Sequence, residues 1–395
     1  MPFEDSAFDR MWADLAPLGR DATTGGYRRF AWTGTDIVLR QWFRGEASAR
    51  GMDVVRDRAG NLWAWRGDPD ADGPGLVLGS HLDSVPDGGA FDGPLGVVSA
   101  FAALDQLTAN GWTPIRPVAV ACFADEEGAR FGVACAGSRL LTGVLDADRA
   151  RSLTDNDGTT MAEAMASAGH DPAVLGRDDE ALRRVGTFLE LHVEQGRALD
   201  DLDAPVGVAE SIWPHGRWRL DLRGQADHAG TTRLADRDDP MLALAAVVLE
   251  ARASAGRHDA LATVGKVRVE PNGVNAIPSA VTAWLDARGP AEDAVRALVA
   301  DVGSAAGTAP VEESWTPDTR FDPQLRDRLA TLLAAPVLPT GAGHDAGILA
   351  AAGIPTAMLF VRNPTGVSHS PAEHAEPADC SAGVAALARA IEALA

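Results

Sequence analysis

The chain has 395 residues, of which 46% are hydrophobic and 23% are charged, and its formal net charge is −21. This length accommodates two domains, each with its own core. The acidic balance excludes nucleic acid and membranes as expected partners, because anionic surfaces require a basic face and no apolar run approaches the roughly 18 residues of a membrane span. We interpret the acidity as a solvated surface.

The N-terminal segment and the cysteines predict a cytoplasmic location. Residues 1–15 are acidic and contain neither the basic n-region nor the apolar h-region of a secretory signal. Cys122, Cys135 and Cys380 are widely spaced, form no CxxC pattern and are expected to be reduced thiols. Lysine occurs once, at Lys266, so no Walker A lysine exists, and no GxGxxG motif follows a strand.

The first half of the chain alternates predicted helices with apolar strands. In chain order we expect a helix over 36–51, a strand pattern over 52–65 that is broken at Gly60-Asn61, a strand over 76–78, a helix over 95–107, and strands over 117–124 and 187–193. This alternation predicts an α/β domain with a mostly parallel sheet flanked by helices. Ligands of such sheets gather beyond the carboxyl ends of the strands.

The pattern changes between about 209 and 316. Alternating strands are expected over 218–222, 261–269 and 281–288, with helices over 241–253 and 291–300. Two strands and a helix, repeated, predict a small α+β domain with one antiparallel sheet. After it come a helix over 322–334, a strand over 357–361 and a closing helix over 382–394. We therefore predict a catalytic domain (1–208 and 317–395) interrupted by a lid or dimerisation domain (209–316).

Histidines and acidic residues follow the predicted strands of the larger domain. His81 and Asp83 lie in a Gly-Ser loop after the strand 76–78. A neutral imidazole binds borderline metals well, and a nearby aspartate can accept the other ring N–H and fix the tautomer. Asp92, in Phe-Asp-Gly-Pro, has two carboxylate oxygens and could bridge two metals. Taken alone, these segments are equally described as a loop histidine with a capping aspartate and a turn aspartate before glycine.

Glu126 and Glu127 end the apolar strand 117–124. Neighbouring residues of an extended chain point in opposite directions, so one carboxylate can bind a metal while the other takes a proton from a nucleophilic water. The alternative is an acidic helix N-terminus, which the helix dipole favours.

Three further histidines lie near strand ends. In the strand 187–193, His192 shares a face with Glu190 and Glu194, and His369 follows the strand 357–361. His344 lies in a Gly-Ala-Gly loop, where small residues let the backbone approach a ligand. Taken alone, His192 and His369 fit a structural role better than a ligand role. Together with the acidic residues they form an imidazole and carboxylate set suited to two divalent metals, which can generate hydroxide near neutral pH.

A serine hydrolase is not supported by the sequence. The segment Gly366–Ser370, GVSHS, lacks the second glycine of a nucleophile elbow, and no other segment supplies GxSxG.

The order and spacing of these segments resemble those of the dinuclear-metal M20 amidohydrolases over nearly the whole chain. The resemblance is to the branch of N-carbamoyl-L-amino acid hydrolases, allantoate amidohydrolases and β-ureidopropionases. It is carried by GSHLDSVPDGGAFDGPLGV, LELHVEQG, ADHAGTT and GVNAIP. M20 peptidases usually have a carboxylate at the position of His192, so this histidine disfavours a plain peptidase.

The resemblance implies two divalent metal ions per subunit, zinc, manganese or cobalt. His81, Asp92 and His192 would hold one ion, and Asp92, Glu127 and His369 the other. Glu126 would be the general base, Asp83 would act with the catalytic residues by orienting His81, and His228 would reach across a homodimer to stabilise the tetrahedral oxyanion. The residues implied to line the substrate site are Gln195, Asn275, Arg288 (on the α-carboxylate) and His344. From the residues alone, Arg288 would be interpreted as a surface arginine and Asn275 as a turn residue.

The sequence departs from the family pattern at two places. Arg233 follows Thr231-Thr232 where a proline is common, and the segment before His369 contains Arg362 in place of a serine-rich loop. We hypothesise that Arg362 binds a second carboxylate or polar end of the substrate. A solvent-facing loop arginine is the alternative.

The resemblance implies a hydrolase that cleaves the C–N bond of a ureido or N-carbamoyl carboxylic acid, with release of ammonia and carbon dioxide. An N-acyl or N-formyl amino acid deacylase, or a peptidase on the same scaffold, is the enzymatic alternative. A non-catalytic metal-containing binding protein is the alternative of another class, and Glu126 beside Glu127 speaks against it.

Overall fold

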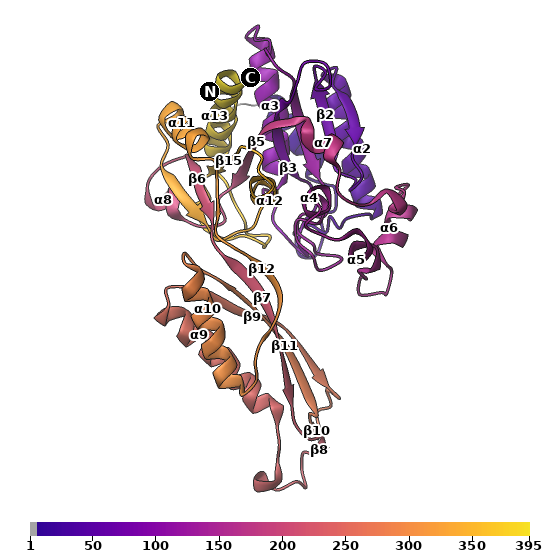
Figure 1. Cartoon of the computed structure of the whole chain (residues 1–395), viewed down its shortest axis with the longest axis vertical. Helices are drawn as coiled ribbons and strands as arrows, with labels where there is room; N and C mark the ends of the chain where they lie inside the picture. Colours follow the sequence, from indigo (N-terminus) through magenta and orange to yellow (C-terminus); the bar gives the residue numbers. More distant parts are fainter. Residues whose placement is uncertain (1–5) are drawn as a thin grey trace. The chain divides into compact units, whose positions relative to one another are not determined.

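The computed structural model describes residues 6–395, so the first five residues of the acidic N-terminal segment lie outside it. Contacts within the chain divide it into two compact units (Figure 1): unit 1 contains the residues up to Glu210 together with Arg320–Ala395, and unit 2 is Ser211–Thr319. In the described part of the chain, no helix is both long and apolar enough to cross a membrane.

Unit 1 is built on a nine-stranded sheet with the order β1-β2-β4-β3-β5-β15-β6-β13, and β14 pairs with β6. The central strands β4, β3, β5 and β15 are parallel, whereas β1, β2 and β6 pair antiparallel with their neighbours. The strands are β1 (Asp53–Arg56), β2 (Leu62–Arg66), β3 (Gly75–His81), β4 (Val118–Phe123), β5 (Val185–Val193), β6 (Val206–Ile212), β13 (Thr319–Arg320), β14 (Val337–Thr340) and β15 (Thr356–Val361).

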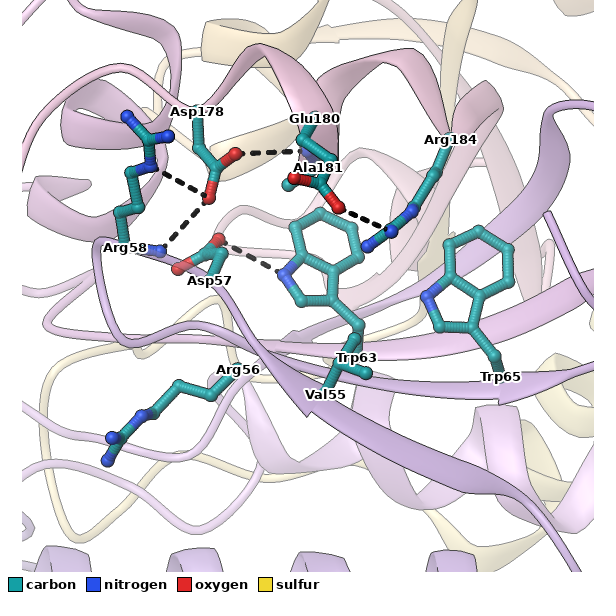
Figure 2. Close-up of a pocket in the computed structure, with 10 residues that line it drawn as sticks. All are labelled: Val55, Arg56, Asp57, Arg58, Trp63, Trp65, Asp178, Glu180, Ala181 and Arg184. Carbon is teal, nitrogen blue, oxygen red and sulfur yellow. Dashed lines mark hydrogen bonds and ion pairs between the residues drawn. The ribbon is translucent and has the colours of Figure 1, made fainter. Parts of the chain in front are cut away.

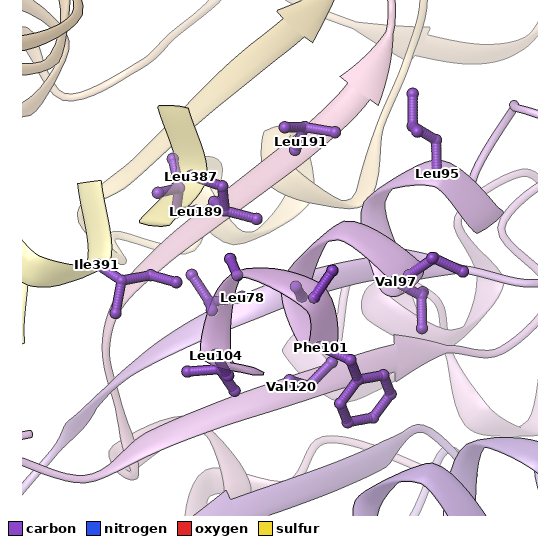
Figure 3. Close-up of a cluster of buried hydrophobic side chains, with 14 of the residues drawn as sticks. Leu78, Leu95, Val97, Phe101, Leu104, Val120, Leu189, Leu191, Leu387 and Ile391 are labelled. Atoms are coloured by element: carbon purple, nitrogen blue, oxygen red, sulfur yellow. The ribbon is translucent and has the colours of Figure 1, made fainter. Parts of the chain in front are cut away.

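Helices flank this sheet. They are α1 (Ala7–Leu15), α2 (Gly34–Ala49), α3 (Pro94–Ala109), α4 (Ala136–Thr142), α5 (Ala147–Ser152), α6 (Met161–Ser167), α7 (Asp179–Arg183), α8 (Ala198–Asp201), α11 (Pro323–Leu333), α12 (Asp345–Ala351) and α13 (Pro377–Leu394). Helix α3 starts with a proline at its first position and is apolar on nearly all sides, as expected of a helix buried in a core. It packs with α13 against β3, β4 and β5, and Figure 3 shows Leu78, Phe101, Val120, Leu189 and Leu387 in this core.

Alternation along β5 separates the core from the candidate site. Leu189 and Leu191 pack into the core with α3 and α13, so Glu190 and His192 point to the other face of the sheet. On that face the backbone N–H of Ala346, at the start of α12, donates to Glu190. One strand therefore supplies both apolar anchors and buried polar groups.

Unit 2 has a four-stranded antiparallel sheet with the order β12-β7-β11-β9, and α9 and α10 pack on one face of it. A separate two-stranded ribbon joins β8 and β10. The elements are β7 (His215–Arg223), β8 (Asp227–His228), α9 (Pro240–Arg257), β9 (Leu261–Glu270), β10 (Ala276–Ile277), β11 (Ala280–Arg288), α10 (Glu292–Ala306) and β12 (Val311–Thr316).

The predicted fold class is confirmed. The long periodic segments appear as expected, for example α2 over 34–49 and β15 over 356–361. The short helices between Ala136 and Arg183, together with β6, β12, β14 and α12, were not predicted, because four to seven residues are too few to display a period. All three cysteines are free and buried.

Candidate metal centre and active site

Four parallel strands bring the predicted metal ligands to one edge of the sheet. Strand β3 ends at His81, β5 ends just after His192, Glu127 follows β4, and His369 lies in the loop after β15. Asp92 comes from the loop between β3 and α3. Since these strands are parallel neighbours, segments far apart in the sequence meet at their carboxyl ends.

Asp92 lies at the centre of this group and uses both of its oxygens. Its Oδ1 is 3.5 Å from His81 Nε2 and 3.2 Å from His192 Nε2, and its Oδ2 is 3.3 Å from His369 Nε2. Glu127 Oε2 is 3.5 Å from the same nitrogen of His369. The five side chains thus form two groups, each compact enough to hold one metal ion, that share the Asp92 carboxylate.

Hydrogen bonds fix the imidazoles of His81 and His192 in the form that binds a metal through Nε2. Nδ1 of His81 lies 3.1 Å from the backbone oxygen of Asp83, and Nδ1 of His192 lies 2.9 Å from that of Val193. A carbonyl oxygen accepts only, so each Nδ1 carries a proton and each Nε2 is the atom left to bind a metal. Both Nε2 atoms are buried and have no hydrogen-bond partner among the described residues.

A glycine next to Asp92 makes room for the His81 ring. Gly93 has a φ of +86°, and a Cβ at this position would lie 2.4–2.6 Å from the imidazole atoms of His81. Any other residue would therefore displace the ring as well as strain the backbone. The Asp-Gly pair of the sequence is required by packing against the ligand and not only by a turn.

Asp83 positions the site through its carboxylate in a way the sequence did not predict. We expected this carboxylate to fix the His81 tautomer, but the backbone oxygen of Asp83 is the closer acceptor and the carboxylate Oδ1 is 3.6 Å from Nδ1. The two carboxylate oxygens accept the backbone N–H groups of Glu126 (3.2 Å) and Glu127 (3.0 Å). Asp83 therefore orients the loop that carries both glutamates.

Glu126 is buried beside the metal-ligand group. Its Oε2 lies 3.7 Å from His81 Nε2, and its Oε1 accepts the thiol of Cys135 at 3.2 Å. The preceding residue, Asp125, has a left-handed φ of +53°, and His369 has a φ of +54°. Such conformations are uncommon for residues other than glycine and occur at sites that surrounding structure holds in place.

The electrostatics of this cluster favour a bound cation. Burial raises the pKa of Glu126 well above its usual range and, with repulsion from Asp92, raises the pKa of Glu127 to about 7. Burial lowers the pKa of His81, but the carboxylates of Glu126, Asp83 and Asp92 outweigh it and raise that pKa. The group thus concentrates negative charge away from water, and divalent cations would relieve the repulsion.

The donor set fits metal ions of the zinc, manganese or cobalt type. Imidazole and carboxylate ligands suit these ions, and the buried Nε2 atoms of His81 and His192 face a shared carboxylate with no hydrogen-bond partner among the described residues.

Comparison with known proteins agrees with this geometry. The sequence profile of the peptidase family M20/M25/M40 matches residues 77–393 of this chain. The chain belongs to this family. The N-carbamoyl-L-amino acid amidohydrolase of Geobacillus stearothermophilus is 34% identical over 96% of this chain and 96% of that protein. The allantoate amidohydrolase of Escherichia coli K12 is 30% identical over 95% of this chain and 94% of its own.

A solved structure shows the same fold. The hydantoinase/carbamoylase family amidase of Burkholderia vietnamiensis superposes with a TM-score of 0.89 at 31% identity, covering 98% of this chain and 97% of that one. The predicted membership of the M20 family is confirmed, and so is the prediction of a hydrolase, since these relatives are amidohydrolases. The family is metal-dependent, in keeping with the ligand groups described above.

Gln195 and His344 lie against the ligands of unit 1. Gln195 Nε2 donates to Asp92 Oδ2 at 2.8 Å and lies within hydrogen-bond distance of Ser368 Oγ. The ring of His344 is buried, with its centroid 4.5 Å from that of His192, and burial lowers the pKa of His344 well below its usual range. A neutral His344 next to a metal ligand avoids adding positive charge to the centre.

Unit 2 brings His228 and Asn275 together. His228 pairs with Ala276 in the β8–β10 ribbon, and the backbone oxygen of Asn275 accepts the N–H of Ala229. The N–H of Gly230 donates to Nδ1 of His228 at 3.0 Å, so the neutral ring carries its proton on Nε2. His228 is exposed and its Nε2–H is a hydrogen-bond donor.

Arg288 lies at the other end of unit 2. It ends β11 opposite His215, whereas the ribbon that holds His228 and Asn275 adjoins the start of that strand. β11 has nine residues, so its two ends are roughly 26 Å apart at about 3.3 Å per residue. Arg288 Nη2 is 2.6 Å from Oδ1 of Asp286, two positions earlier on the same face.

Arg362 does not support the hypothesis of a substrate-reading arginine. Its Nε and Nη2 bond both carboxylate oxygens of Asp379 at 2.9 and 3.0 Å, and its Nη1 bonds Asp203 at 3.1 Å. These ion pairs join the loop after β15 to the start of α13 and to the turn after α8. The bidentate geometry indicates a structural role, because a substrate would have to displace a buried carboxylate.

Several polar residues around the ligands were missed in the sequence. Glu190 accepts from Ser80 and from the N–H of Ala346, Ser138 donates to Asp345, and Glu373 accepts two N–H groups of the Asp92 loop. Of these residues, only Glu190 could have been found from the sequence, because it shares a strand face with His192. Ser80 lies in β3, Ser138 in α4, Asp345 in α12 and Glu373 in the loop after β15, and no periodic pattern reveals that these segments come together.

A separate hollow of about 140 Å³ shares no residue with the metal-ligand group (Figure 2). It lies between β1, β2 and α7 and is lined by Trp63 and Trp65 together with charged side chains. These charges are largely satisfied within the hollow, because Arg184 pairs with Glu180 and Arg58 with Asp178. We assign it no role in catalysis.

Proposed function

We propose that this protein is a metal-dependent amidohydrolase that cleaves the C–N bond of a ureido or N-carbamoyl carboxylic acid and releases ammonia and carbon dioxide. The observation that carries the proposal is the pair of ligand groups sharing Asp92, with Glu126 beside them. Relatives named N-carbamoyl-L-amino acid amidohydrolase and allantoate amidohydrolase support N-carbamoyl-L-amino acids and allantoate as candidate substrates.

In this proposal His81, Asp92 and His192 hold one divalent ion, and Asp92, Glu127 and His369 hold the other. Two such ions would activate a water molecule near neutral pH and polarise the ureido carbonyl. Glu126 accepts the proton of the attacking water and passes it to the departing nitrogen. The carboxylate of Asp83 keeps Glu126 in place by accepting the backbone N–H of Glu126. Gln195, which donates to Asp92, orients the substrate.

Residues of unit 2 complete the site in the proposal. Arg288 binds the substrate carboxylate, since its planar guanidinium matches two oxygens. His228 donates its Nε2–H to the oxyanion of the tetrahedral intermediate, and Asn275 beside it binds the substrate. Because Arg288 is roughly 26 Å along β11 from the other two, one small substrate cannot touch all three in a single chain. We therefore assign His228 and Asn275 to the partner subunit of a homodimer.

Unit 2 has a surface suited to that dimer. Strand β9 pairs with β11 on one side only and is the edge of its sheet, and α9 exposes Leu242 (73%) and Leu249 (71%). Open edges and contiguous exposed apolar side chains are covered by pairing in stable proteins. The proposed dimer joins two copies through this edge and helix, so that unit 2 acts as the lid and dimerisation domain.

Turnover of a substrate panel tests the chemistry. The metal-loaded enzyme is expected to release ammonia from N-carbamoyl-L-amino acids or allantoate and to leave N-formyl and N-acyl amino acids and dipeptides largely intact. A preference for N-formyl or N-acyl amino acids or for dipeptides would establish the deacylase or peptidase alternative. No turnover of any of these substrates would favour a metal-containing binding protein.

Mixed dimers test the assignment to two subunits. Glu126→Gln and His228→Ala are each expected to be nearly inactive. Mixing and reassociating them in equal amounts is expected to restore roughly a quarter of the wild-type rate, since half of the dimers are mixed and each contains one complete site. Without restoration, and with mixed dimers present, His228 acts in its own subunit.

A further inference from the structure

We propose that Glu373 is a positioning residue that fixes the Asp92 loop and thereby the carboxylate shared by the two ligand groups. Glu373 lies four residues after His369 and is only 5% exposed. Its Oε1 accepts the backbone N–H groups of Phe91 at 2.8 Å and of Asp92 at 2.9 Å. This inference rests on the proposed metal centre and adds a residue to it.

The same carboxylate connects two loops that lie far apart in the sequence. Glu373 Oε2 is 3.2 Å from Ser368 Oγ, and that hydroxyl is also 3.3 Å from Asp92 Oδ2. The backbone N–H of Glu373 donates to the oxygen of Ser370, which closes a turn directly after His369. Glu373 therefore ties the loop of one ligand to the loop of another, about 280 residues away in the chain.

The absence of a side chain at Gly89 makes room for Glu373. A Cβ on Gly89 would lie 2.3 Å from Glu373 Oε1 and 2.4 Å from its Cβ. Gly89 has no left-handed φ, so an alanine at this position suits the backbone, and the atoms nearest to its Cβ belong to Glu373. Gly89 therefore leaves the space that the Glu373 side chain occupies. This packing, and not only chain flexibility, explains the glycine at this position before Phe91.

Asp83 provides an independent parallel within the same site. It accepts the consecutive N–H groups of Glu126 and Glu127, as Glu373 accepts those of Phe91 and Asp92. Each loop that presents a carboxylate to the centre is held by a second carboxylate through two neighbouring amides. Outer groups of this kind orient metal ligands, and their loss typically lowers metal affinity about 10–100-fold.

The geometry explains why the effect should appear in metal binding. Both oxygens of Asp92 must stay within reach of three imidazoles, at 3.2–3.5 Å. Without Glu373 two buried N–H groups lose their acceptor, and the loop can rotate to satisfy them elsewhere. Such a rotation moves the shared carboxylate away from both ligand groups at once.

The test is a titration of the metal-stripped full-length protein with Mn²⁺. Binding is measured by calorimetry or by competition with a fluorescent chelator. Glu373→Ala and Gly89→Ala are both expected to weaken Mn²⁺ binding about 10–100-fold. Glu373→Gln keeps a carbonyl oxygen for the two amides and should remain close to the wild type. The control is Glu376→Gln, which changes an exposed carboxylate three residues further along that bonds His374.

The outcomes separate this inference from the proposed function. Wild-type protein that binds no Mn²⁺ would remove the metal centre itself. Wild-type protein that binds two ions, together with a folded Glu373→Ala variant of unchanged affinity, would overturn the role of Glu373. The same holds if Glu373→Ala lowers the melting temperature equally with and without Mn²⁺ but leaves its affinity unchanged. If Glu373→Ala does not fold, Gly89→Ala decides between the outcomes, because it displaces the carboxylate without removing it.

Discussion

Replacing Arg362 by alanine distinguishes a structural cation from a substrate-binding one. In the structure its guanidinium forms a bidentate pair with Asp379, whose side chain is 4% exposed, and a single contact with Asp203, whose side chain is 99% exposed. The bidentate geometry raises the pKa of Arg362, with the Asp379 hydrogen bond as the main cause. The variant would leave Asp379 buried without its partner.

The expected loss of stability is about 3 kcal/mol. Removing one partner of a buried pair costs about 3–5 kcal/mol because the other charge stays desolvated. Two features reduce this figure. The side chain of Arg362 is 23% exposed, so water screens the pair, and Asp379 lies in the first turn of α13, where the helix dipole stabilises a carboxylate by about 0.3–1 kcal/mol. The Asp203 contact adds less than about 0.5 kcal/mol, since that partner is fully in solvent.

Urea denaturation of four proteins measures these terms. Arg362→Ala should lose about 3 kcal/mol, and Arg362→Ala/Asp379→Ala should recover part of that loss because no buried charge remains. Asp203→Asn, which tolerates the left-handed φ of +47° at this position, should match the wild type. In the same variants the ratio of kcat/KM for acidic over neutral substrates should not change. A loss below about 1 kcal/mol, or a marked fall of that ratio, would refute the structural assignment.

Three further predictions follow from the site and its surroundings. Glu126→Gln should lower kcat about 10²–10⁴-fold while Mn²⁺ affinity is retained; steady-state kinetics and metal titration measure this, and a parallel loss of metal binding would contradict a role in proton transfer. Chelation of divalent ions should abolish activity and lower the melting temperature, because the ligand cluster then keeps its repulsion, and Mn²⁺ should restore both; activity that survives complete stripping would exclude the proposed centre. Burial raises the pKa of Asp57 from 3.8 to about 6, so the folded state is stabilised when this carboxyl is protonated. This stabilisation is fully present below pH about 4 and is lost as the pH rises through 6. Relative to Asp57→Asn, the free energy of unfolding of the wild type should therefore fall by about 1 kcal/mol between pH 5 and pH 7.5 in chemical denaturation; a constant or growing difference would show that the carboxyl is not raised.

The positions of three proposed metal ligands were predictable because these residues follow apolar strands. His81, Glu127 and His192 come at or just after strands of a parallel sheet, and the carboxyl ends of such strands share one edge. Asp92 and His369 lie in loops, and the sequence pointed to them through the resemblance to a family. The general position of the site and its set of ligands could thus be predicted from the sequence.

The contacts of individual side chains were not predictable in the same way. Arg362 lies in a loop seven residues before His369, and sequence proximity suggested the substrate pocket, yet its partner is Asp379 on α13. For Asp83 the sequence predicted a contact with His81 but assigned it to the carboxylate. In the structure the backbone oxygen of Asp83 contacts His81, and the carboxylate accepts the N–H of Glu126. Such choices depend on the direction of a side chain in a loop, which no periodicity encodes.

The sequence by itself determined the α/β architecture and the edge of the sheet where the candidate site lies, because hydrophobic alternation and strand polarity are local properties. Only the tertiary structure decided how the loops are held there. Gly93 lies under the ring of His81, Asp83 bonds the glutamate loop, and Glu373 bonds the loop of Asp92. These contacts join segments from about 12 to about 280 residues apart, and they exist only once the sheet has brought the loops close together.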